Sequence, residues 1–356
     1  MPLSSLRLRD FRCYASLQCP LTSGITIFTG SNAQGKTSLL EAACVLLRLQ
    51  SPRTSSAREL IRFGSPSFGI AGSTTHSELR HEAGPDGKSL LAGGQTVRRS
   101  ADYLAASELV VWFSNSDRSL VTGTSDLRRR YLDFLGSQLF PDYLPTLRRC
   151  DAALRSRNFL LRRDASPPWP QIDAYSRILA TEGARLTELR SSLMNALGPA
   201  ASAAHTAVSL SSESLSLPWH PGSEPDYLAQ LERLRPEELR RRITAAGPHR
   251  DDFTPTIDGR PADRFASEGQ QRTVAIALRL AQASVLASLS HRHPILLIDD
   301  VFGELDPARR NALLNSLPTT SQKLITTTHL DWLDDSFLPD TIWNVSSGSL
   351  TQRLPP

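Results

Sequence analysis

The spacing of apolar residues predicts a strand, a loop and a helix near the N-terminus. Leu6 and Leu8 alternate with arginines, which is typical of β structure with one buried face. Residues 24–28 form an apolar run that predicts a buried strand, and this strand is expected to end at Gly30. A helix is expected from about Lys36, because apolar residues then recur at helical spacing.

The pattern changes twice further along the chain. Residues 60–112 alternate between short apolar runs and turn residues, which predicts hairpins that extend the first lobe. From about 126 to 245 the pattern is mostly helical and rich in arginine. The clearest stripe runs from Ile172 to Leu193, is expected to end at Gly198-Pro199, and is far too short for a long coiled-coil arm. It is expected to pack inside a helical lobe.

A second β region begins at residues 253–257, where Asp258-Gly259 predicts a hairpin turn. A long helix is expected from Gly269, and alternating strands and helices follow to the end of the chain. Their expected positions are a strand at 295–298, a helix after Pro307, a strand at 324–326 and a terminal strand at 342–345. The sequence therefore predicts an α/β lobe, 1–112 plus 246–356, that is split by a mainly helical, arginine-rich lobe at 113–245.

The composition limits the binding partners and the cellular compartment that can be expected for this protein. The net charge is +4, and lysine occurs only at Lys36, Lys88 and Lys323, so nearly all positive charge is arginine. A compositional bias toward arginine explains this excess as well as phosphate recognition does. The positive net charge is compatible with binding to nucleic acid but does not prove it. No apolar run approaches the roughly 18 residues of a membrane span, and there is no signal-peptide pattern. The four cysteines show no disulfide or metal pattern, so we expect a cytoplasmic protein without a membrane partner.

A phosphate-binding loop joins the first buried strand to the first helix. It matches the Walker A pattern in full and consists of Gly30, Ser31, Asn32, Ala33, Gln34, Gly35, Lys36 and Thr37. Its glycines let backbone N–H groups turn toward phosphates, and the helix N-terminus adds a favourable dipole. Lys36 is expected to reach the β and γ phosphates of ATP, and the hydroxyl of Thr37 is expected to hold Mg²⁺.

The run 267–272, Ser-Glu-Gly-Gln-Gln-Arg, resembles the signature motif of ABC-type ATPases, in which two chains complete each other's ATP site. Ser267, Gly269 and Gln270 are the residues expected to act on the partner's γ-phosphate. Ser267 and Gln270 also form a capping box before an apolar helix, which is a purely structural explanation. Both interpretations hold together if the capped helix N-terminus is the anion site.

The strand at 295–298 ends in two acids, and further candidates follow it. Asp299 suits a role beside Mg²⁺, and Asp300 is expected to orient or activate the attacking water. The same ABC-type resemblance makes Asp306 a candidate contact to the opposite chain. It also makes His329 a candidate sensor of the γ-phosphate.

Arginines gather between residues 128 and 163, with fewer aspartates to oppose them. Arg128, Arg129 and Arg130 are the candidates for contact with DNA phosphates, although a solvated helix face explains such runs about as well. Few aromatic residues lie among these arginines, which argues against a platform for stacking single strands.

Nearly the whole chain resembles the RecF family of bacterial recombination mediators, which are ABC-type ATPases related to the heads of SMC and Rad50 proteins. The resemblance rests on LRLRDFR (6–12), GSNAQGKTSLLEA (30–42), GPHRDD (247–252), SEGQQR (267–272), LRLAQ (278–282) and LIDDVFGELD (297–306). It implies an ABC-type P-loop ATPase head without a long coiled coil.

This resemblance also implies a function. A pair of chains with two ATP molecules would bind double-stranded DNA and single/double-strand junctions, and with RecR and RecO would help place RecA on gaps; slow hydrolysis would release the DNA. Asp300 stands where transporters usually have glutamate, and Glu268 replaces the first glycine of the signature. The alternatives are the nucleotide-binding subunit of a transporter, which the arginine-rich insertion fits poorly, and a small-molecule kinase, which needs no signature.

Overall fold

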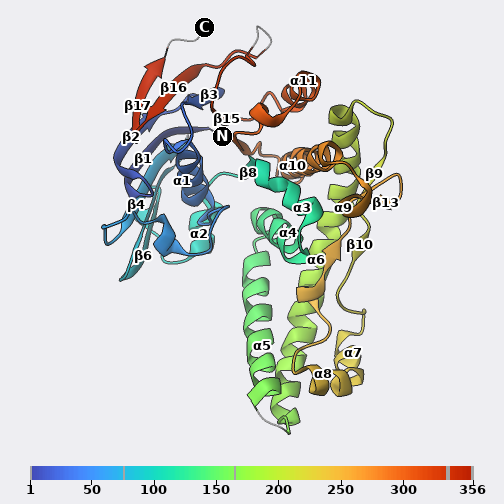
Figure 1. Ribbon diagram of the computed structural model, residues 1–356. Helices are drawn as coiled ribbons and strands as arrows, with labels where there is room; N and C mark the ends of the chain where they lie inside the picture. Colours follow the sequence, from blue (N-terminus) through green and yellow to red (C-terminus); the bar gives the residue numbers. More distant parts are fainter. Residues whose placement is uncertain (1, 75–76, 164–165, 334–336, 354–356) are drawn as a thin grey trace. The chain divides into compact units, whose positions relative to one another are not determined.

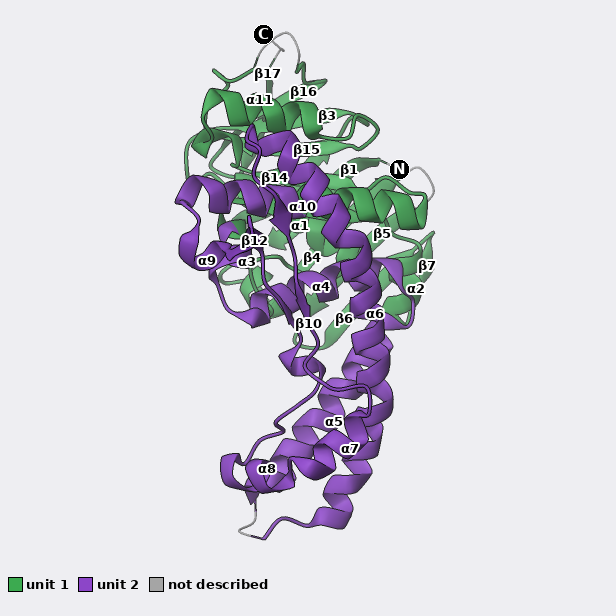
Figure 2. Cartoon of the chain, turned by 90° about the vertical axis from the view of Figure 1, so that its right-hand side faces the viewer, with its two compact units in different colours: residues 1–117, 279–356 green, residues 118–278 purple. Residues whose placement is uncertain are grey.

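The computed structural model describes residues 2–74, 77–163, 166–333 and 337–353. The chain divides into two compact units, coloured separately in Figure 2. Unit 1 comprises Met1–Asp117 and Arg279–Pro356, and unit 2 comprises Arg118–Leu278. One unit is therefore inserted into the other in sequence, as expected, but the bounds differ from the predicted lobes.

The difference in bounds has a physical cause in strand pairing. Strand β8 (Val110–Ser114) pairs in parallel with β14 (Ile295–Asp299), which holds residues up to 117 in unit 1. The short strands of the second β region pair with strands of the insertion, so residues 246–278 belong to unit 2. Pairing of this kind joins segments far apart in sequence, and apolar periodicity does not report it.

Unit 1 contains a mainly parallel sheet with the order β17-β16-β3-β15-β14-β8 (Figure 1). Besides β8 and β14, its strands are β3 (Ile25–Thr29), β15 (Lys323–Thr327), β16 (Thr341–Ser346) and β17 (Ser349–Arg353). The expected strands at 24–28, 295–298, 324–326 and 342–345 are thus all present. The strands β3, β8, β14 and β15 run in parallel, so their carboxyl ends meet at one edge, where ligands bind in open α/β sheets.

A second, antiparallel sheet in unit 1 has the order β2-β1-β4-β5-β6-β7. Its strands are β1 (Leu3–Phe11), β2 (Tyr14–Pro20), β4 (Phe68–Thr74), β5 (Glu78–Gly84), β6 (Gly87–Ala92) and β7 (Gln95–Thr96). Helix α1 (Lys36–Arg48) contacts strands of both sheets and is buried almost throughout, so it forms the core between them. The other helices of unit 1 are η1 (Ala57–Leu60), α2 (Ser100–Ala105), η4 (Phe302–Glu304) and α11 (Pro307–Ser316), while η2 (Asn115–Arg118) leads into unit 2.

Unit 2 is mainly helical, as predicted. Its helices are α3 (Ser119–Thr122), α4 (Ser125–Leu139), α5 (Tyr143–Arg163), α6 (Trp169–Ser209), α7 (Tyr227–Arg233), α8 (Arg235–Arg241), η3 (Pro248–Arg250) and α9 (Ala262–Phe265). Its strands are β9 (Leu215–Ser216), β10 (Trp219–His220), β11 (Asp252–Phe253), β12 (Thr256–Ile257) and β13 (Arg260–Pro261). Helices α5 and α6 lie side by side as a hairpin, and α7 and α8 lie near the turn end of that hairpin (Figure 1).

Helix α6 corrects one expectation, because it does not end at Gly198-Pro199. It continues through Pro199 to Ser209. A proline removes one N–H donor and crowds the preceding turn, which costs about 3 kcal/mol in a helix interior. Burial of Ala201, His205 and Val208 beyond the proline offsets that cost. The expected turn at Asp258-Gly259 is confirmed by pairing of β12 with β13.

Helix α10 (Glu268–Ser290) begins in unit 2 and ends in unit 1. By length and composition it is apolar enough to cross a membrane, which the sequence pattern did not lead us to expect. However, 61% of its most apolar stretch is buried inside the protein, and the core helix of a globular protein passes the same test. The four cysteines are all free, and only Cys13 is exposed.

Candidate functional site

The phosphate loop follows β3 and leads into α1, as the sequence predicted. Gly30 has φ +145° and Gly35 has φ +106°, which are conformations that side chains rarely adopt. Space is short as well: a Cβ on Gly30 would collide with the carbonyl oxygen of Val345, and one on Gly35 would lie 2.7 Å from the Tyr14 hydroxyl. Both glycines are therefore required for the loop to close.

Lys36 holds this loop in shape. Its Nζ donates to the carbonyl oxygens of Gly30 at 2.6 Å and Ser31 at 2.8 Å. An ammonium group has three donors, so one remains for a phosphate. Burial lowers the pKa of Lys36, while Asp300 and Asp299 act in the opposite direction. A buried cation of this kind is well placed to gain from an anionic ligand.

Asp299 joins the loop to the acidic strand. Its Oδ1 accepts hydrogen bonds from the hydroxyls of Thr37 and Thr326, each at 2.8 Å. Burial raises the pKa of Asp299, and these two hydroxyls partly counteract that shift. A hydroxyl and a carboxylate in contact, beside a phosphate loop, are hard oxygen donors of the type that Mg²⁺ prefers. The residues predicted to hold the metal are therefore adjacent in space.

Asp300 is strained and incompletely satisfied. Its φ of +52° lies in the left-handed region, which costs about 1–2 kcal/mol for a residue with a side chain. Its Oδ1 is buried and has no hydrogen-bond partner among the described residues. Burial also raises its pKa, with Lys36 acting in the opposite direction. Strain and an unsatisfied carboxylate oxygen together are typical of a functional position.

His329 lies in the same neighbourhood. A Cβ on Gly303 would lie 3.7 Å from His329 Cε1 and 3.8 Å from Asp300 Oδ1, so the two side chains flank this glycine. The His329 Nδ1 is hydrogen-bonded to the Thr328 hydroxyl at 2.8 Å. The structure thus brings the predicted sensor and the carboxylate predicted to orient the attacking water together.

Asp306 has a structural function. It is the N-cap of α11, and its Oδ1 accepts from the backbone N–H of Arg309 at 2.9 Å. A cap of this type stabilises a helix by about 1 kcal/mol. Contact with a second chain remains a prediction for this residue.

Asn115 is a residue that the sequence analysis missed. It follows β8, and its amide Nδ2 donates to the carbonyl oxygen of Asp300 at 3.0 Å and to Glu304 Oε1 at 2.9 Å. Its signal in the sequence is a polar residue just after a buried strand, but only the pairing of β8 with β14 shows which edge it reaches. Asn115 supports the strained backbone of Asp300.

The signature run opens α10, within unit 2. The expected capping box is present: Ser267 N–H donates to Gln270 Oε1 at 2.7 Å, and Gln270 N–H donates to Ser267 Oγ at 3.3 Å. Gln270 Nε2 also donates to Glu213 Oε1 at 2.7 Å, and Arg118 pairs with Glu268 at 2.9 Å. Gly269 lies in the first turn of the helix, and Ser267 is exposed.

The three arginines of α4 differ from one another in a way that the sequence did not reveal. Their side chains are 12% exposed for Arg128, 15% for Arg129 and 73% for Arg130. Arg128 makes a bidentate pair with Asp252 at 2.6 and 2.8 Å and donates to the carbonyl oxygen of Gly123. Arg129 donates to the carbonyl oxygen of Asp251. These contacts show that the guanidinium groups of Arg128 and Arg129 support unit 2, and Arg130 is the exposed candidate. Contact with DNA stays a prediction for all three.

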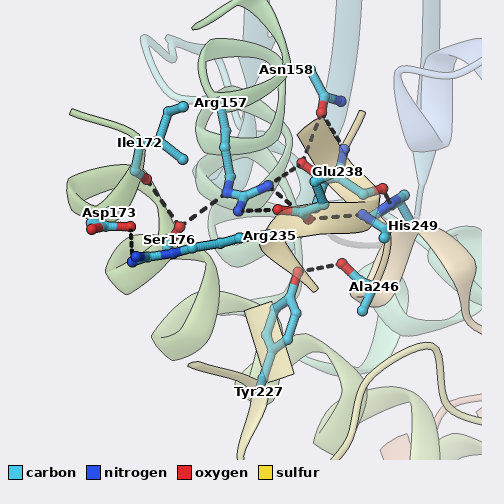
Figure 3. A network of polar contacts seen from close by, with 12 residues as sticks. Arg157, Asn158, Ile172, Asp173, Ser176, Tyr227, Arg235, Glu238, Ala246 and His249 are labelled. Carbon is cyan, nitrogen blue, oxygen red and sulfur yellow. Dashed lines mark hydrogen bonds and ion pairs between the residues drawn. The ribbon is translucent and has the colours of Figure 1, made fainter. Parts of the chain in front are cut away.

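Other arginines form a buried polar network near the end of the helical hairpin (Figure 3). Arg157 pairs with Glu238 at 2.6 Å, and the two side chains are 1% and 0% exposed. Arg157 also donates to the hydroxyls of Ser176 and Thr244. Because every one of its nitrogens has a partner, this arginine is structural, and it ties α5 and α6 to α8 and the chain that follows.

Comparison with known proteins identifies the family. Residues 2–347 match the model of the RecF/RecN/SMC N-terminal domain. The DNA replication and repair protein RecF of Synechococcus sp. (strain JA-2-3B'a(2-13)) is 37% identical, over 98% of this chain and 97% of that protein. The chain belongs to the RecF family.

Solved structures agree with this RecF assignment. The recombination mediator protein RecF with ATP, in the RecFOR pathway, matches at a TM-score of 0.90 and 26% identity, over 99% of this chain and 97% of that one. An SMC head bound to the C-terminal winged-helix domain of ScpA matches at a TM-score of 0.58 and 17% identity, over 99% and 97% of the two chains. This second likeness shows the shared fold alone.

The RecF family assignment confirms the predicted fold class, an ABC-type ATPase head without a long coiled coil. It also confirms that the chain is an ATP-binding ATPase of DNA replication and repair. The transporter and kinase alternatives are thereby set aside.

Proposed function

We propose that this chain is an ATP-dependent DNA-binding recombination mediator of the cytoplasm, in which ATP joins two copies of the chain. The observation that carries the proposal is the exposed Ser267 capping box at the start of α10. A capped N-terminus of a 23-residue helix is an anion site, and its anion would be the γ-phosphate bound by the second copy. Asp306 would contact the second copy beside this phosphate.

Within one copy, Lys36 and the loop 30–37 would bind the phosphates of ATP. Thr37 and Asp299 would hold Mg²⁺, which when bound neutralises phosphate charge. Asp300 would orient the attacking water, and its Oδ1, which accepts no hydrogen bond from the described part of the chain, provides an acceptor for that water. His329 would sense the γ-phosphate, because its side chain lies beside Asp300, which would orient the water that attacks this phosphate. An aspartate reaches less far than a glutamate, which fits slow hydrolysis that serves release.

The paired chains would bind double-stranded DNA through its phosphates, without reading sequence. Arg130 is the exposed candidate on α4, and its ion pair with Asp126 at 2.8 Å is solvent-exposed, so exchanging it for a DNA phosphate would cost little. At gaps the DNA-bound pair would work with RecR and RecO to help place RecA. The RecF relatives named for DNA replication and repair support this role.

The test is fluorescence anisotropy of a labelled duplex, titrated with protein in Mg²⁺ with and without ATP. The control variant is Lys36→Met, which removes the charge on the phosphates but keeps a side chain of similar length. We expect duplex binding that needs ATP and is weakened on the order of 100-fold or more by Lys36→Met. Binding that is indifferent to ATP would overturn the proposal.

A further inference from the structure

Phe63 is exposed to an unusual degree. Its relative exposure is 101%, whereas the other large apolar residues that are exposed in the described chain range from 39% to 65%. Single exposed apolar side chains are common on protein surfaces, so exposure alone assigns no function. The rigidity and charge of the surrounding segment are what make this ring informative.

The turn that carries Phe63 is held firmly. Ser65 N–H donates to the carbonyl oxygen of Arg62 at 3.0 Å, which closes a β-turn with Phe63 and Gly64 at its centre. Gly64 has φ +85°, as the third position of a type II turn requires. The Arg62 N–H donates to the carbonyl oxygen of Asp10 at 2.8 Å, and the Ser65 hydroxyl donates to Asp10 Oδ1 at 2.8 Å.

The segment before the turn is anchored too. Ile61 forms a β-bridge with Phe11, and Arg12 N–H donates to the carbonyl oxygen of Leu60 at 2.8 Å. The ring of Phe63 is thus presented to solvent from a fixed backbone. A ligand that stacks on it has little backbone entropy to remove.

Cationic residues lie close to Phe63 in the sequence. The segment 53–62 carries Arg53, Arg58 and Arg62 against the single acid Glu59. Arg58 is exposed, and no ion pair within the described ranges engages it. Arg62 is 3.7 Å from Asp10, and Arg53 is 3.5 Å from Glu41, so both are only loosely paired. A backbone of phosphates could therefore pass along this segment.

We infer that Phe63 is a stacking site for an unpaired nucleobase, with Arg58 and Arg62 binding the adjacent phosphates. The inference rests on the proposed DNA binding and deepens it, because it assigns to Phe63 the contact with the first unpaired base of a duplex that continues into a single strand. Aromatic rings stack on any base, so this site would read an exposed base rather than a sequence.

A protein partner and an intact duplex fit the surface around Phe63 less well than an unpaired base does. A protein partner needs a patch of neighbouring apolar groups around its anchor, but the residues next to Phe63 in the chain are Arg62, Gly64 and Ser65. The bases of an intact duplex are already stacked on one another and offer no free face to a ring. An unpaired base beside a phosphate backbone satisfies both the ring and the arginines.

The experiment compares two DNA probes with the full-length protein in ATP and Mg²⁺. One probe is a blunt duplex, and the other is the same duplex with a single-stranded extension that carries 2-aminopurine at its first unpaired position. The variants are Phe63→Ala, Phe63→Leu and Phe63→Trp, with Phe159→Ala as the matched control because Phe159 is also exposed. Anisotropy gives affinity, and quenching of 2-aminopurine reports stacking.

We expect Phe63→Ala and Phe63→Leu to bind the extended duplex about 5- to 100-fold more weakly than wild type and to lose the quenching. Phe63→Trp and Phe159→Ala should match wild type. Blunt-duplex affinity should be the same for all of them. The inference is overturned if Phe63→Ala binds the extended duplex normally, or if Phe63→Leu preserves the quenching.

These outcomes are separate from a failure of the proposed function. If wild type binds no blunt duplex in ATP, the proposed function fails whatever Phe63 does. The extended duplex and the quenching then still decide whether Phe63 stacks on a base.

Discussion

Two polar clusters of this chain contrast in how completely their charges are satisfied. At the strand ends of unit 1, Asp300 has a left-handed backbone and a buried oxygen without a partner among the described residues. The ammonium group of Lys36 uses two of its three hydrogen-bond donors for carbonyl oxygens of its own loop. Inside unit 2, Arg157 and Glu238 are fully buried, and each nitrogen of the guanidinium is hydrogen-bonded.

This contrast indicates that the first cluster is suited to bind a ligand and that the second cluster stabilises the fold. A satisfied buried ion pair has nothing left to offer a ligand, and breaking it leaves an uncompensated charge. An unsatisfied, strained carboxylate is costly for the free protein, and it is explained if a ligand later completes its contacts. Substitution in the first cluster should therefore change ATP chemistry, whereas substitution in the second should change stability.

The largest effect is expected from Asp300→Asn. Loss of the group that orients or activates water should lower the rate of ATP hydrolysis by about 10²- to 10⁴-fold while ATP still binds. Because burial raises the pKa of Asp300, its charged form is lost as the pH falls through that raised pKa. The wild-type rate should therefore decline at a higher pH than for an ordinary carboxylate. Single-turnover hydrolysis measured across pH checks both expectations, and a normal rate in the variant would remove Asp300 from its role.

The next effect is expected from Arg157→Met. Removing one partner leaves Glu238 buried and uncompensated, so the free energy of unfolding should fall by about 3–5 kcal/mol. The matched control is Arg233→Met, which breaks the exposed pair with Glu224 and should cost no more than about 1 kcal/mol. Urea denaturation of both variants measures the difference. Equal losses would show that the buried network contributes no more than a surface pair.

A smaller effect is expected from Asn115→Ala, which removes the amide that holds the backbone of Asp300. One neutral hydrogen bond contributes about 0.5–1.5 kcal/mol, so the hydrolysis rate should fall roughly 2- to 10-fold. ATP affinity should stay unchanged, because the amide makes its contacts to Asp300 and Glu304 rather than to the phosphate loop. A change confined to ATP affinity would contradict this positioning role.

The sequence predicted those parts of the site that depend on local spacing. The phosphate loop, Asp299, Asp300 and the capping box of Ser267 follow from short runs whose neighbours in sequence are also neighbours in space. The differences among Arg128, Arg129 and Arg130 were not predictable, because Asp251 and Asp252 reach α4 only through the fold. Asn115 was missed for the same reason. Helix α6 passed through Pro199 because packing outweighed a local signal.

If the signature of one chain completes the ATP site of another, ATP must change the mass of the protein in solution. Analytical ultracentrifugation would compare wild type with Ser267→Arg, each with and without ATP and Mg²⁺, alongside binding of a fluorescent ATP analogue. We expect ATP to double the mass of wild type. We expect Ser267→Arg to bind the nucleotide and to stay a single chain, since the substituted side chain would act on the site of the second chain. A wild-type mass unchanged by ATP, or normal pairing of Ser267→Arg, would rule out a signature that acts across the interface.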